Sequence, residues 1–111
     1  MAKKITFIKG AGNISIICNV INHETGKPLP LNSFLGATAY FPHQDETSKV
    51  AVTGSLFSAD CGQVVFIPTE AQGDLFLEGE DQTFQYRVDA NAQRLIAQVN
   101  EGLTVLANLT D

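Results

Sequence analysis

Four side chains in this sequence could serve as nucleophiles, general bases or metal ligands: Cys18, Cys61, His23 and His43. A catalytic nucleophile needs a base within hydrogen-bond reach, and none of these residues stands in a recognisable arrangement of Ser, Cys, His and Asp. The spacing of the two cysteines matches no zinc or redox motif. We therefore predict that the chain is not an enzyme, and keep a small enzyme using Cys61 or a histidine as a distant alternative.

The same four residues have ordinary structural explanations. The even number of cysteines leaves a disulfide between Cys18 and Cys61 open, but a reducing compartment argues against one. We predict two buried thiols that behave as small hydrophobic side chains, and two exposed histidines in polar loops. Cys61 precedes Gly62 in a turn, yet no Lys, Arg or His lies nearby in sequence to favour its thiolate.

Oxygen-rich residues gather around one predicted corner, at Asp74, Glu78, Glu80 and Asp81. Their spacing lacks the D-x-D-x-D-G pattern of a calcium loop. The glycines form neither a dinucleotide-binding G-x-G-x-x-G nor a phosphate loop. We expect a solvated acidic corner, no catalytic residue, no metal and no cofactor, while Ca²⁺ binding by a loop stays open.

The aromatic residues are seven Phe and two Tyr, with no Trp. Sugar-binding domains often present an exposed Trp or Tyr as a stacking surface, so this composition weakens a lectin interpretation without removing it. Most aromatic residues fall at predicted strand positions and are expected in the core. Phe57 and Phe76 flank turns, and if they are exposed they are candidates for an oligomer interface.

Composition narrows the classes of protein further. The 111 residues fit one domain, residues 1–111, and at 44% apolar residues the chain is too hydrophobic for disorder. No apolar run is long enough to span a membrane. No hydrophobic signal-peptide region follows Lys3 and Lys4, so we expect synthesis in the cytoplasm. The net charge of −5 argues against nucleic-acid binding.

The elements that must position these residues are short strands. Val, Ile and Thr favour extended backbone, and apolar residues alternate with polar ones between turn signals. A single helical turn is expected over residues 70–72, with Thr69 as its N-cap. The pattern predicts an all-β antiparallel sandwich or barrel. The eight predicted strands are residues 4–9, 14–21, 35–41, 49–57, 63–67, 82–89, 93–99 and 103–109.

A series of motifs is similar to one known family. In this chain they are Gly26-Lys27-Pro28-Leu29-Pro30-Leu31, Gly36-Ala37-Thr38-Ala39, Gly62-Gln63-Val64-Val65-Phe66-Ile67-Pro68-Thr69, Leu75-Phe76-Leu77-Glu78-Gly79 and Phe84-Gln85-Tyr86-Arg87-Val88. From about residue 5 to 107 the sequence resembles the immunoglobulin-like N-terminal domain of phage baseplate upper proteins and related virion modules. It departs from that family at Gly10-Ala11-Gly12-Asn13, where Gly-Asp is usual.

The resemblance implies an immunoglobulin-like antiparallel β-sandwich of seven or eight strands, and a structural component of a phage or prophage particle in the tail, baseplate or fibre. Its partners would be copies of itself, as a trimer or hexamer, and other virion structural proteins. We expect strands 4–9 and 103–109 to form the open sheet edges, with the lysines of the first strand limiting unwanted pairing. The candidate interface residues are Phe57, Phe76, Tyr40, Leu103 and Val105.

The alternative function is an immunoglobulin-like adhesion or carbohydrate-binding module. Its contact surface would come from loops 43–48 and 73–81, with Tyr40 or Phe76 essential for glycan binding.

Overall fold

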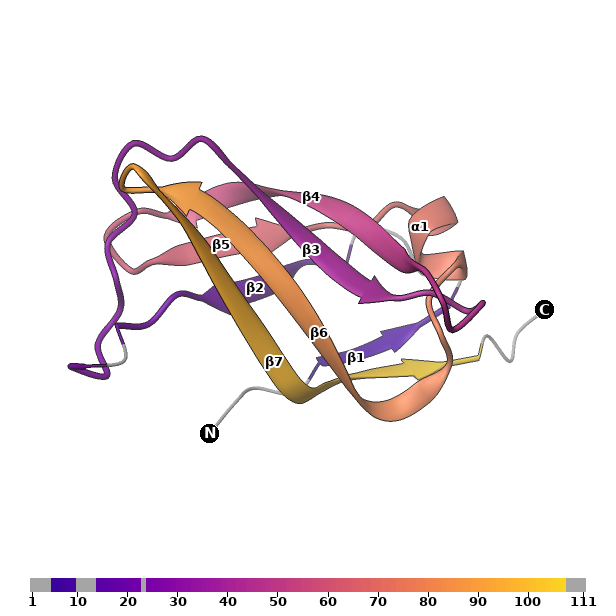
Figure 1. Ribbon diagram of the computed structural model, residues 1–111. Coiled ribbons are helices and arrows are strands. Elements are labelled where there is room, and N and C mark those ends of the chain that lie inside the picture. Colours follow the sequence, from indigo (N-terminus) through magenta and orange to yellow (C-terminus); the bar gives the residue numbers. More distant parts are fainter. Residues whose placement is uncertain (1–4, 10–13, 23, 108–111) are drawn as a thin grey trace.

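The computed structural model describes residues 5–9, 14–22 and 24–107, and within them it contains seven strands and one short helix (Figure 1). Some of the predictions concern residues outside these ranges. They are the predictions for Lys3, for Lys4 at the start of the first strand, for His23 and for residues 108 and 109 at the end of the last strand. The elements are β1 (Ile5–Ile8), β2 (Ile16–Asn19), β3 (Gly36–Pro42), β4 (Lys49–Ser58), β5 (Gln63–Phe66), α1 (Glu70–Asp74), β6 (Gly79–Ala90) and β7 (Gln93–Leu106).

The strands join in one hydrogen-bonded order, β1-β7-β6-β3-β4-β5-β2. The all-β prediction is confirmed, and the sandwich layout stays a prediction because the single sheet curls into a nearly barrel-like shape. One pair departs from the antiparallel expectation, because β1 runs parallel to β7 with Ile5 opposite Leu103. The predicted edge at residues 103–109 is wrong, since β1 and β6 flank that part of β7, whereas β1 is an edge as predicted.

Strand β7 replaces two predicted strands. Residues 93–99 and 103–106 belong to one strand that bends at Glu101, where φ is 54°, instead of ending there. At the bend Gly102 packs so closely on Val99 that an added Cβ would overlap the Val99 side chain. The break between the predicted strands 93–99 and 103–109 is therefore a bend within one continuous strand.

Strand β4 makes the sheet curl. Its first half pairs with β3 and its second half with β5, and Gly54 is paired to both Ala37 and Phe66. A Cβ at Gly54 would lie 2.5 Å from the Phe66 ring, so only glycine lets that ring cross the strand. As a result β2 and β5 lie across the core from β6 and β7 (Figure 1), with the Phe66 and Tyr86 rings 6.0 Å apart.

Aromatic residues fill the core between these layers. Phe7, Phe76, Phe41 and Phe84 form a chain of ring contacts with centroids 4.9–5.1 Å apart, and all four are buried. The inward faces predicted for residues 14–21 and 82–89 are confirmed. In the predicted strand 35–41 the alternation holds except at its first residue, because Leu35 precedes β3 and is 84% exposed.

The predicted helical turn exists as α1. Thr69 accepts the backbone N–H of Gln72, and the Gln72 side chain accepts the N–H of Thr69, which completes a capping box. This helix stands over the N-terminal strand, since a Cβ at Gly73 would lie 2.5 Å from the Phe7 ring. The helix therefore closes one end of the core.

Candidate docking groove between strands β2 and β7

The two halves of β7 have different neighbours. Leu103–Leu106 lies between β1 and β6, and we call it the covered half. Gln93–Val99 pairs with β6 alone within the described part of the chain, and we call it the bare half. Seven residues of extended backbone thus keep one side without a neighbouring strand there.

A second free edge faces the bare half. Strand β2 ends the sheet order, with β5 as its single neighbour among the described strands. Val20 donates its backbone N–H to Gly62 on the β5 side. Because backbone groups alternate between the two sides of a strand, those of Ile17 and Asn19 point away from β5.

A groove of about 620 Å³ lies between these two edges. Apolar side chains predominate among its lining residues, and Leu95, Ala97 and Val99 of the bare half are half-buried beside it. The lining residues are Ile5, Ile17, Cys18, Asn19, Val20, Ile21, Leu29, Phe84, Tyr86, Val88, Arg94, Leu95, Ile96, Ala97, Gln98, Val99 and Asn100.

Tyr86 spans the groove at one point. Its hydroxyl donates to the backbone oxygen of Asn19 at 2.8 Å, which ties β6 to the free edge of β2. Burial, and to a smaller extent the charge of Cys18, raises the pKa of Tyr86 to about 12. Burial likewise raises the pKa of Cys18 to about 12, so this thiol stays protonated and is a poor nucleophile at neutral pH.

The groove differs in charge from the rest of the acidic molecule. Arg94 is the single charged residue among those that line it, and no Asp or Glu does. Exposed sheet edges are commonly protected by Lys, Pro or a bulge. Residues 95–100 contain neither a charge nor a proline, and Ile96 is 68% exposed. This edge is therefore chemically open to another strand.

The structure separates the predicted interface residues. Phe76, Leu103 and Val105 are at most 1% exposed, so the prediction that they meet a partner is corrected: their alternation faces the core. Phe57 is exposed near the end of β4, and Tyr40 is half-buried on the opposite face of β3 from the core. None of the five lines the groove.

Sequence reasoning missed the bare half, although one signal was present. The alternation of Leu95, Ala97 and Val99 predicts the inner face of a strand, and the uncharged outward side chains between them, Ile96 and Gln98, are that signal. Lack of charge on the solvent face of a strand is a sign of a covered or pairing edge.

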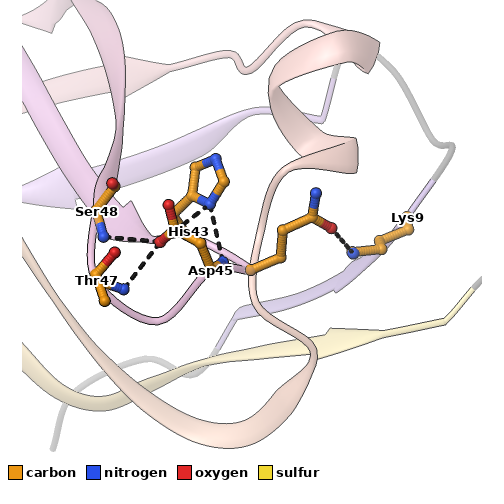
Figure 2. Close-up of polar contacts among 6 residues, drawn as sticks. Lys9, His43, Asp45, Thr47 and Ser48 are labelled. Atoms are coloured by element: carbon orange, nitrogen blue, oxygen red, sulfur yellow. Dashed lines mark hydrogen bonds and ion pairs between the residues drawn. The ribbon is translucent and has the colours of Figure 1, made fainter.

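Loops 43–48 and 73–81 meet at the far end of the molecule, where the backbone N–H of Gln44 donates to Leu75 and that of Leu77 donates to Pro42. Figure 2 shows the first loop closed by Asp45, whose carboxylate accepts the backbone N–H groups of Thr47 and Ser48 at 2.8 Å. These two bonds lower the pKa of Asp45 to about 2.

His43 is part of the same closed loop and is only 21% exposed, which corrects the expected exposed histidine. Its Nδ1 lies 3.3 Å from the Asp45 carboxylate and accepts the backbone N–H of Asp45 at 3.0 Å. In this geometry the side chains of His43 and Asp45 hold the backbone of the loop, so both have a structural role.

The cysteines differ from the prediction in one respect. Cys18 is buried as expected, but Cys61 is exposed because the turn at residues 59–62 carries it outward. Both thiols are free, so the disulfide left open above is not formed.

Two general features complete the description of the site. In residues 5–9, 14–22 and 24–107, no three His, Cys, Asp or Glu side chains gather as a metal-binding group. The same residues include no helix with the length and hydrophobicity to cross a membrane. Comparison of the chain with protein-family models, curated proteins and solved structures gives no match.

Proposed function

We propose that this chain is a non-enzymatic structural module that docks by accepting an extended strand along the bare half of β7. The observation that carries the proposal is a seven-residue edge, with Arg94 as its one charged residue, bordering an apolar groove of about 620 Å³. An added strand satisfies the free backbone N–H and C=O groups, and its alternate side chains enter the groove. Recognition of this kind needs neither a cofactor nor a catalytic group.

A second copy of the chain is a suitable partner for this edge. Antiparallel pairing of two bare halves centred on Ile96 places Arg94 opposite Gln98 and Leu95 opposite Ala97, so no like charges meet. Such a symmetric contact closes at two copies. A trimer or hexamer instead requires the bare half to pair with the free edge of β1 or β2 from the next copy.

The test is the mass in solution, measured by light scattering over a wide concentration range. We expect an oligomer for the wild type and a monomer for Ile96→Lys, which places a charge at the centre of the edge. The matched control is Leu35→Lys, an exposed apolar residue outside the groove, which should assemble like the wild type. A monomeric wild type at every concentration contradicts self-assembly through this edge.

The proposal extends to location. We propose that the module belongs to the tail or baseplate of a phage or prophage particle, with other virion structural proteins as further partners. The support is the sequence resemblance described above. Mass spectrometry of purified particles tests it, because a virion component stays with the particles through a density gradient and a free host protein does not.

A further inference from the structure

The chain has two arginines, Arg87 and Arg94, and both lie on the face of β6 and β7 that points away from the core. They come from neighbouring strands, since Arg87 is paired with Ile96 and Arg94 with Asp89. In a protein with a net charge of −5, this face therefore gathers the guanidinium groups in one place.

One carboxylate lies between the two arginines. Asp89 Oδ1 is 3.3 Å from Arg94 Nε, and Asp89 Oδ2 is 3.6 Å from Arg87 Nε. Arg87 Nε is buried and has no hydrogen-bond partner. Each guanidinium carries five N–H donors, so a single carboxylate leaves most of them to other acceptors. The local charge is one positive unit in excess.

A hollow of about 220 Å³ adjoins these groups. Tyr40 and Gln85 line one part of it, and Arg87, Arg94 and Ile96 line another. The Gln85 amide donates to Gln98 at 3.0 Å, which holds the amide group in place. The lining thus combines guanidinium donors, an amide, an aromatic ring with a hydroxyl and an aliphatic side chain.

We propose that this hollow, which shares Tyr86, Arg94 and Ile96 with the lining of the docking groove, binds an acidic sugar through its carboxylate. Guanidinium groups bind planar carboxylates with two parallel hydrogen bonds. One excess positive charge on an acidic molecule matches a singly charged carboxylate better than a phosphate or sulfate polyanion. The volume is below the range of about 300–1,000 Å³ for drug-sized ligands, which suits a single ring.

The surroundings favour a sugar over an acidic peptide. Strands β3 and β6 are paired on both sides, so at Tyr40, Gln85 and Arg87 the backbone offers nothing to the amide groups of a peptide. Recognition by this part of the hollow must use side chains. The Gln85 amide and the Tyr40 hydroxyl can pair with sugar hydroxyls, while the Tyr40 ring and Ile96 can cover the apolar face of the ring.

The experiment is a titration of the ¹⁵N-labelled full chain with sodium glucuronate, followed by amide chemical shifts. We expect saturable shifts centred on Tyr40, Gln85, Arg87 and Arg94. Arg94→Gln should weaken binding about tenfold, because a charge-assisted pair is lost. The matched control Lys49→Gln removes one positive charge elsewhere and should bind like the wild type.

Asp89→Asn should change the affinity for glucuronate in the opposite direction to Arg94→Gln. Asp89 competes with the ligand for both arginines, so its neutralisation should tighten glucuronate binding by about threefold. A protein that merely needs Asp89 for folding would bind more weakly instead. The amide spectrum of each variant reports separately that the chain is folded.

Three results would overturn the proposal. Glucose at the same concentrations producing equal shifts would remove the role of the carboxylate. N-acetyl-glutamate amide binding as tightly as glucuronate would replace the sugar by an acidic peptide. An Arg94→Gln variant that binds glucuronate as tightly as the wild type would show that the ligand does not bind in this hollow. These outcomes are independent of the oligomeric mass, so a failure here leaves the docking proposal intact.

Discussion

The two halves of β7 show how one strand can be packed inside the sheet at one end and have an unpaired edge, open to a partner strand, at the other. The covered half lies between β1 and β6, and Leu103 and Val105 are buried there. The bare half has β6 alone beside it in the described structure, with half-buried residues on one face and Ile96 exposed on the other. The difference lies in the neighbouring strand and the sheet behind, since both halves alternate apolar residues on their inner face.

The largest expected effect is a difference in unfolding free energy between substitutions in the two halves. Leu103→Ala should lower the free energy of unfolding by about 2–5 kcal/mol, because it leaves a cavity in the core. Ile96→Ala should change it by less than about 0.5 kcal/mol in the monomer, because that side chain is exposed. Urea unfolding at low protein concentration measures both, and equal losses would contradict the comparison.

Substitution at Gly102, at the junction between the two halves, should give the next largest loss of stability. Gly102→Ala adds a methyl group that overlaps Val99 and lies 3.6 Å from the Phe84 ring, so we expect a loss of about 1–3 kcal/mol. Gly36→Ala is the matched control, because a Cβ there has open space around it. Thermal unfolding of the two variants should differ clearly, and a neutral Gly102→Ala would show that the bend does not depend on this close packing.

A smaller effect should appear in the groove beside the bare half. Tyr86→Phe removes the hydroxyl that donates to Asn19, at a cost of about 0.5–1.5 kcal/mol. Amide hydrogen exchange in β2 should become faster, while the covered half stays protected. Tyr40→Phe serves as the control, and similar exchange in both variants would argue that the Tyr86 hydroxyl does not hold the edge.

The smallest effect concerns the loop at the far end of the molecule. The pKa of Asp45 is about 2 in the folded state and near 3.8 without these contacts, so its contribution to stability is complete above about pH 4. That contribution is lost as the pH falls toward 2. The stability difference between wild type and Asp45→Asn should therefore shrink below pH 4.

Acid titration of unfolding for both proteins measures this difference. Glu46→Gln removes a charge from the neighbouring residue and provides the control. A difference that stays constant from pH 6 to pH 2 would contradict the role of the charged Asp45 in closing the loop.

Sequence patterns predicted the local features of this fold well. The inward faces of residues 14–21 and 82–89, the break between the predicted strands 82–89 and 93–99 and the cap at Thr69 all depend on neighbours close in sequence. Alternation tells which face of a strand is apolar, because side chains alternate along every strand.

The same patterns could not show which strands become neighbours. The parallel pairing of β1 with β7 and the crossing of Phe66 over Gly54 join residues far apart in the sequence. Alternation in residues 103–105 was consistent with an interface or with a core, and only the presence of β1 decides between them. The groove follows from these distant pairings, whereas Arg94 meets Asp89 across the local hairpin between β6 and β7.

The parallel pairing of β1 with β7 also determines when the fold can be completed. Ile5 is synthesised well before its partner Leu103, which lies 98 residues later in the sequence. Contacts between distant parts of a chain form slowly, because a long loop must close first. The hairpins β3–β4 and β6–β7 can form as soon as they are made, whereas Phe7 must wait for β7 and α1 before it is covered. Nascent chains that stop before residue 103 should therefore keep β1 undocked.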